Sequence, residues 1–261
     1  MNFSCAVDVD VRELLDSEAR RINSPAFIEH DPVQFPRRYS ALADIEIAAL
    51  LSATIAWGKR TMICRNCERM LSMMDSSPLQ YVMDGAYEAL DPAVNVHRTF
   101  FNRNLMYYLR GLRGIYSRYD SIADFARTRG VHRSEFPAWD FAKALSAELS
   151  SANAQSSDSR CLPANIDKTA LKRINMAMRW LVRDDGIVDM GVWSFMKPSQ
   201  LFIPLDVHVG NVSRELGLLA RRQDDRKAVE ELTGVLRTLC PDDPVLYDYA
   251  LFGIGVGALK Q

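Results

Sequence analysis

Residues 166–185 read IDKTALKRINMAMRWLVRDD, and this stretch decides which class of fold the chain can adopt. Apolar side chains that recur every three or four residues are typical of a helix with one buried face. Here they are Leu171, Ile174, Met178 and Leu181. The opposite face carries polar side chains at steps of 4, 3, 4 and 4 residues: Lys168, Lys172, Asn175, Arg179 and Arg183. The stretch therefore predicts one long amphipathic helix.

That polar face has two interpretations. A row of charges along a helix is most often a solvated surface, but a cationic row can also face the phosphates of a nucleic acid. Lys172 lies next to Arg173. A lysine that is near other cations and partly removed from water loses its proton more easily, and it can then act as an amine nucleophile.

The rest of the chain also has helical patterns. We expect helices over 43–60, where ADIEIAALLSATIAWGKR is almost wholly apolar after Asp44, and over 98–119 and 136–152. Residues 153–165 are rich in small polar side chains and predict an exposed loop. Because strand patterns are nearly absent, the sequence predicts an all-α fold.

Composition limits the class of protein. The chain has 261 residues, 48% hydrophobic and 25% charged, with a net charge of -1, so a nucleic-acid ligand would need a local basic face. Its five cysteines are irregularly spaced, which argues against a secreted disulfide framework. The first residues lack the apolar core of a signal peptide, and no run approaches the roughly 20 apolar residues of a membrane helix. We therefore expect a cytoplasmic protein.

A second stretch, LFIPLDVHVGNVSRELGLL (201–219), places Asp206 between an apolar run and a helical pattern. An aspartate at that boundary is a good N-cap, because its carboxylate accepts a backbone N–H of the first turn. Gly217 is a plausible stop signal. Capping alone would explain Asp206, but a capped carboxylate also stays ionised and can stabilise a developing cation or take a proton.

Three segments resemble the helix-hairpin-helix DNA glycosylases, the group that includes endonuclease III. PLDVHVGNVSRELGL resembles their VDTHV…R…RLG segment, LLSATIAWGKR (50–60) resembles their LLSAQ helix, and YDYALFGIG (247–255) resembles their late helix ending in ALMELG. The order is the same. Residues 186–205, however, lack the hairpin motif LPGVG-x-K-T-A. Lys172 instead lies 34 residues before Asp206, which looks like the archaeal 8-oxoguanine DNA glycosylase branch.

The resemblance implies a two-lobed helical protein, with a helical barrel lobe over 40–185 and a second lobe formed by 1–39 and 186–261. It implies a monomeric DNA glycosylase with AP lyase activity that removes a damaged base, with 8-oxoguanine favoured, from double-stranded DNA. Lys172 would attack C1′ of the deoxyribose, and Asp206 would stabilise the charge that develops. Lys168 and Lys197 are weaker candidates for the lysine. No metal and no cofactor is implied.

The expected DNA-binding residues come from three regions. Trp57, Lys59 and Arg60 end the LLSAQ-like helix, where relatives meet DNA. Asp189 and Trp193 could line the pocket for the base, and His208 could contact a phosphate. The polar face of the 166–185 helix adds Lys168, Asn175 and Arg179.

Two other readings stay open. A non-catalytic nucleic-acid-binding relative would also explain the missing hairpin motif. A metal-dependent phosphohydrolase of the HD type would use the pair His30 and Asp31, although neighbouring prolines predict a loop there. The C-x-x-C of Cys64 and Cys67 has no second pair, and Cys240 stands alone near the C-terminal end, so no metal centre or iron–sulfur cluster is expected.

Overall fold

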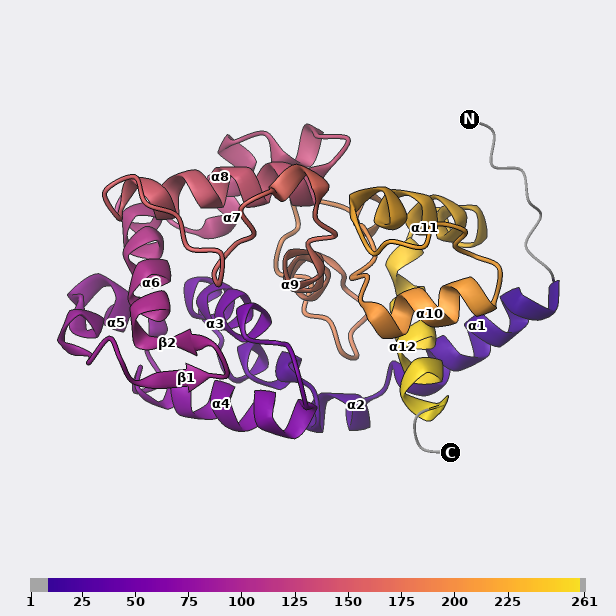
Figure 1. Cartoon of the computed structure of the whole chain (residues 1–261), viewed down its shortest axis with the longest axis horizontal. Coiled ribbons are helices and arrows are strands. Elements are labelled where there is room, and N and C mark those ends of the chain that lie inside the picture. Colours follow the sequence, from indigo (N-terminus) through magenta and orange to yellow (C-terminus); the bar gives the residue numbers. More distant parts are fainter. Residues whose placement is uncertain (1–8, 259–261) are drawn as a thin grey trace.

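The computed structural model describes residues 9–258, and the predicted all-α fold is confirmed (Figure 1). Residues 1–8, which include Cys5, and residues 259–261 lie outside the described residues. Both segments belong to the predicted second lobe. The α-helices are α1 (Val9–Ile22), α2 (Pro25–Glu29), α3 (Leu42–Thr54), α4 (Arg60–Ser72), α5 (Pro78–Asp84), α6 (Asn102–Tyr116), α7 (Ile122–Thr128), α8 (Pro137–Ser151), α9 (Lys172–Val182), α10 (Val207–Glu215), α11 (Arg226–Leu239) and α12 (Tyr247–Ala258). Short 3-10 helices are η1 (Pro32–Gln34), η2 (Pro36–Arg38), η3 (Ala86–Ala89), η4 (Val131–Arg133), η5 (Ile166–Lys168), η6 (Pro198–Gln200) and η7 (Pro244–Leu246). No described helix combines the length and apolar character needed to cross a membrane.

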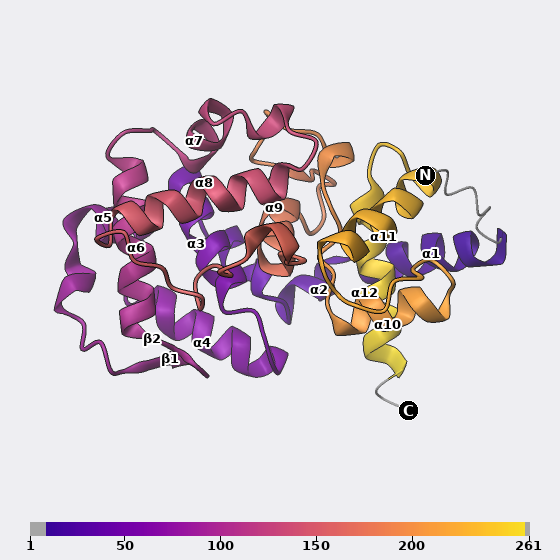
Figure 2. The same cartoon turned by 45° about the horizontal axis from the view of Figure 1, so that its top comes forward.

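The helices form two groups, which we call the first and second lobe (Figures 1 and 2). The first lobe contains α3 to α9, together with a small antiparallel hairpin of β1 (Asn95–His97) and β2 (Phe100–Phe101). The second lobe contains α10, α11 and α12, and α1 packs along α12. The beginning of the described chain therefore lies beside its end, and α9 lies at the border between the lobes.

The first lobe is built around α3. Nearly every residue of this helix is buried, including the carboxylate of Glu46. Glu46 accepts hydrogen bonds from the backbone N–H groups of Ile122 and Ala123, the hydroxyl of Tyr116 and the indole of Trp193. Burial raises the pKa of Glu46, and these four donors satisfy its oxygens. Trp193 therefore belongs to the core of the first lobe, although it follows residue 186, where the second lobe was predicted to resume.

The helix predicted over 166–185 is wrong in its first third. Residues 166–168 form η5, and Leu171 adopts a left-handed conformation with φ 50°, so α9 begins only at Lys172. Between them, Thr169 forms an isolated β-bridge with Asp225 of the second lobe, and its carbonyl accepts a hydrogen bond from the Trp139 indole. These long-range contacts hold the chain extended and override its local helical preference.

Most of the polar face of α9 is buried, so its interpretation as a solvated surface is wrong for three of its residues. Asn175, Arg179 and Arg183 are only 1%, 3% and 3% exposed. Both arginines pair with Asp189, at 3.3 Å and 3.1 Å. Arg179 also pairs with Asp248 on α12. Arg183 also pairs with Asp185 and Asp243, and these side chains together form one ionic network. The network joins α9 to the second lobe, and a buried arginine needs such partners because an isolated charge is very costly in the interior.

Candidate active site

Asp206 caps α10, as predicted. Its Oδ1 accepts hydrogen bonds from the backbone N–H groups of His208 at 2.9 Å and Val209 at 3.0 Å. The residues before it, 201–205, are buried, and Gly217 follows the end of the helix with φ 71°. The carboxylate is thus fixed on a helix N-terminus, and its second oxygen stays free for another partner.

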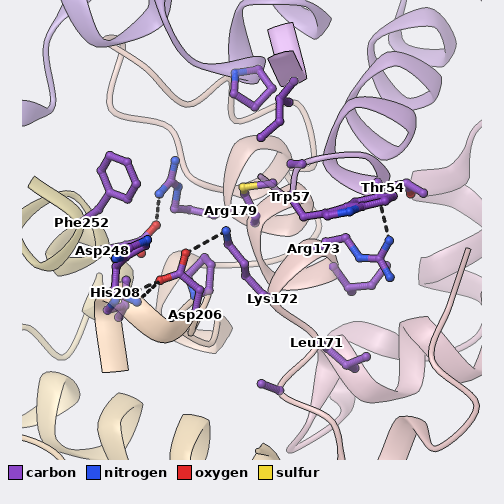
Figure 3. Close-up of a pocket in the computed structure, with 18 of the residues that line it drawn as sticks. Thr54, Trp57, Leu171, Lys172, Arg173, Arg179, Asp206, His208, Asp248 and Phe252 are labelled. Carbon is purple, nitrogen blue, oxygen red and sulfur yellow. Dashed lines mark hydrogen bonds and ion pairs between the residues drawn. The ribbon is translucent and has the colours of Figure 1, made fainter. Parts of the chain in front are cut away.

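That partner is Lys172. Its Nζ lies 2.9 Å from Asp206 Oδ2, and the two side chains are 34% and 19% exposed (Figure 3). Lys172 is the first residue of α9 in the first lobe, whereas Asp206 precedes α10 in the second lobe. Because Leu171 is left-handed, α9 begins at Lys172. The Lys172 side chain therefore lies at the N-terminal end of the helix.

Several interactions act on the ionisation of Asp206. Burial alone would raise its pKa, but the Lys172 ammonium and the N–H of Val209 more than offset that effect and hold the pKa below the ordinary value. Asp206 is therefore an anion at neutral pH, fixed in place beside an amine. An arrangement of this kind can stabilise positive charge that develops on a bound molecule.

The pair lies in a pocket of about 900 Å³ between the lobes. In Figure 3, Trp57, Thr54 and Arg173 lie on one side of Lys172 and Asp206, while Phe252, Asp248 and His208 lie on the other. Apolar side chains dominate, with a few polar groups among them, as in sites that bind small organic groups. The pocket is large enough for one nucleotide.

Asp248 is a pocket residue that the sequence did not reveal. It is 7% exposed, lines the pocket and pairs with Arg179 (Figure 3). Burial raises its pKa to about 6, against the lowering effect of Arg179. The only signal in the sequence is an acidic side chain within the otherwise apolar stretch YDYALFGIG.

The predicted DNA-binding residues divide into two sets. Trp57, Lys59, Arg60, Arg179 and His208 all line the pocket. Of these, Arg179 is held by carboxylates in the buried ionic network and does not form part of a solvated cationic row.

The other predicted residues lie elsewhere. Lys168 is exposed on η5, and Asn175 is buried with its amide donating to the carbonyl of Ala170. Asp189 and Trp193, the predicted base pocket, are 2% and 0% exposed and do not line it. Both side chains have partners in the core, since Asp189 pairs with two arginines and the Trp193 indole donates a hydrogen bond to Glu46. Lys197 is an exposed residue at the start of η6, outside the pocket.

Asp31, the acid of the His30–Asp31 pair, already has partners within the described residues. Asp31 caps η1 through the N–H of Val33 and lies 3.6 Å from Arg60, so it is already engaged. Within residues 9–258, no three His, Cys, Asp or Glu side chains are grouped so that they could hold a metal ion. This applies to the His30–Asp31 pair and to Cys64 and Cys67 alike.

Comparison with known proteins places the chain in one family. The model of the family described as "Protein of unknown function (DUF2400)" matches residues 31–257, which includes both Lys172 and Asp206. No curated protein and no solved structure matches the chain. The family match covers most of the chain, and the protein therefore belongs to the DUF2400 family.

Proposed function

We propose that the protein is a DNA glycosylase with AP lyase activity, acting as a cytoplasmic monomer on double-stranded DNA that contains a damaged base. One observation carries the proposal. An amine and a carboxylate from different lobes, Lys172 and Asp206, lie 2.9 Å apart in a pocket that could admit one nucleotide. This is the pair that such chemistry requires, because the amine forms the covalent bond and the anion stabilises the sugar cation.

The reaction begins when the damaged nucleotide leaves the base stack and enters the pocket. The Lys172 ammonium releases a proton to water, and the neutral amine attacks C1′ of the deoxyribose. The base departs with the electron pair of the glycosidic bond and takes up a proton from water. Asp206 stabilises the positive charge that develops on the sugar. Its lowered pKa makes it a weak base, so its main contribution is electrostatic. Opening of the sugar ring gives an imine, and β-elimination then cleaves the strand.

Borohydride trapping tests the proposal. The protein is incubated with duplexes that carry single lesions, including 8-oxoguanine, and borohydride reduces any imine to a stable protein–DNA adduct. A lesion with an intact glycosidic bond is essential, because an abasic site reacts with many exposed amines. Native protein should form the adduct, and Lys172→Gln should not. Lys168→Gln and Lys197→Gln are matched controls, since both lysines are exposed and lie outside the pocket.

Two results would contradict the proposal. An adduct that persists in Lys172→Gln would show that another amine reacts. If no lesion gives an adduct although the protein binds DNA tightly, the result would support the second candidate, a non-catalytic DNA-binding protein. That candidate is favoured by residues 186–205, whose only described helical element is the short η6 and which therefore form no pair of helices around a hairpin.

A further inference from the structure

Trp57 differs from the other tryptophans of the chain. Trp139, Trp180 and Trp193 are each 0% exposed, whereas Trp57 is partly exposed and lines the pocket. Figure 3 shows its ring on the first-lobe side, across Lys172 and Asp206 from Phe252. A large aromatic ring that is left partly open beside a pocket is available to stack on a flat ligand.

His97 on β1 holds Trp57 in place. His97 is 0% exposed, and its Nδ1 lies 2.8 Å from the amide nitrogen of Asn66. Because that amide donates, Nδ1 accepts, so the proton is on Nε2, which donates to the carbonyl of Trp57 at 2.8 Å. The two rings also meet edge to face, with centroids 4.7 Å apart.

Arg173 fixes the indole from another direction. Its guanidinium carbon lies 5.5 Å from the centre of the Trp57 ring. The same guanidinium donates to the carbonyl of Thr54 at 2.7 Å and to that of Arg160 at 3.0 Å, so it is itself immobilised (Figure 3). The orientation of Trp57 is thus set before any ligand binds, which lowers the entropy lost on binding.

Arg98 places a positive charge beside Gly58, the residue that follows Trp57 in the chain. It occupies the turn between β1 and β2 with φ 50°, and its carbonyl accepts a hydrogen bond from the Asn95 amide at 2.6 Å. Its side chain packs against Gly58, where an added Cβ would lie 2.8 Å from Arg98 Nη1. Arg98 and Lys59 both line the pocket, and neither forms an ion pair with a carboxylate of the described residues.

We infer that Trp57 and Arg98, connected through His97, form a nucleotide-binding subsite on the first-lobe wall of the pocket. The indole stacks on one base, and the guanidinium binds the phosphodiester beside it, with Lys59 adding to the local positive charge. Stacking on an aromatic ring beside a cation is the usual way in which proteins hold a single nucleotide unit without reading its sequence. The inference rests on the proposed action on DNA, but it does not depend on the chemistry of Lys172.

Fluorescence quenching tests the stacking directly, because Trp57 is the only tryptophan of the chain within reach of an external quencher. The native protein is titrated with a duplex that carries a stable tetrahydrofuran abasic analogue, and acrylamide quenching is measured with and without DNA. Bound DNA should protect the quenchable emission. Trp57→Leu should remove that emission and weaken binding about 10-fold or more.

The phosphate contact is measured by the salt dependence of binding. Arg98→Gln should reduce the slope of log affinity against log salt concentration by about 1. Arg133→Gln is the matched control, because Arg133 is an exposed arginine of the first lobe outside the pocket, and its slope should match that of the native protein.

His97 is tested as a positioning residue by two variants. His97→Phe keeps a ring but loses both hydrogen bonds, so DNA should no longer protect Trp57. His97→Gln retains a donor toward the Trp57 carbonyl and should restore the protection, which a merely structural role of the ring would not predict. Should His97→Phe fail to fold, the Trp57 and Arg98 variants still decide the question.

The outcomes separate the two proposals. Trapping by native protein, together with unprotected Trp57 and an unchanged slope for Arg98→Gln, would overturn the subsite and leave the glycosylase proposal standing. Protection of Trp57 without any trapped adduct would support the subsite and count against the glycosylase. No affinity for any DNA would overturn both.

Discussion

The charge of Asp206 can be removed without removing its structural role. Asp206 and Asp225 are both N-caps with almost the same backbone conformation, φ -125° and ψ -176° for Asp206, φ -124° and ψ -175° for Asp225. Asp206 faces Lys172, whereas Asp225 faces Arg221. Asparagine caps a helix about as well as aspartate. Asp206→Asn therefore tests the charge at the candidate active site, and Asp225→Asn is its matched control.

The two variants should have similar stability and different activity. A partly solvated ion pair contributes at most about 1 kcal/mol, so each melting temperature should fall by no more than roughly 2–4 °C. Loss of a fixed charge that stabilises a transition state lowers a rate by about 10²–10³-fold. Asp206→Asn should therefore trap a lesion-containing duplex at least about 100-fold more slowly than native protein. Asp225→Asn should trap at the native rate.

Single-turnover trapping with excess protein gives these rates, and thermal denaturation monitored by circular dichroism gives the stabilities. Equal trapping by Asp206→Asn and the native protein would refute the argument that this carboxylate stabilises the sugar cation. A loss of activity shared equally by Asp225→Asn would show that helix capping, rather than charge beside the amine, explains the effect.

Three further predictions concern stability and are checked by chemical or thermal denaturation. Asp189→Asn leaves two buried arginines short of a carboxylate and should lower the free energy of unfolding by about 3–5 kcal/mol. Gly111→Ala would place its Cβ 2.2 Å from Leu149 Cδ2 and should destabilise by about 1–3 kcal/mol, whereas Gly114→Ala on the same helix meets nothing within 4 Å and should stabilise by up to about 1 kcal/mol. The pKa of Asp206 is lowered from the ordinary 3.8, so its charge stabilises the fold above pH 3.8, and this contribution is lost as the pH falls through the lowered pKa. The difference in melting temperature between native protein and Asp206→Asn should therefore be constant well above pH 3.8 and should shrink as the pH falls below 3.8.

Features that depend on neighbouring residues could be predicted from the sequence. The capping role of Asp206 follows from its position between an apolar run and a helical pattern, and the structure confirms it. The all-α class follows from hydrophobic periodicity. The proximity of Lys172 to Asp206 was inferred from a family resemblance, and the 2.9 Å distance agrees with it, while the activity itself remains a proposal.

Features that depend on distant partners could not be predicted. The charges of Arg179 and Arg183 predict an exposed helix face, because periodicity alone cannot show that carboxylates from other segments will cover it. The start of α9 depends on the bridge between Thr169 and Asp225, which lie far apart in the chain. Asp248 cannot be predicted for the same reason, because its role depends on the ion pair that joins α12 to Arg179 of α9.

The division of the Lys172–Asp206 pair between the lobes limits how this chain can be recombined with a homologue. Lys172 belongs to one lobe and Asp206 to the other, and the arginines of α9 find their acids on both sides of that boundary. A chimera that takes its first lobe from one homologue and its second from another must match these charges and the width of the groove at once. Such a chimera should therefore keep these ion pairs only where both homologues carry the same acidic and basic side chains at these positions.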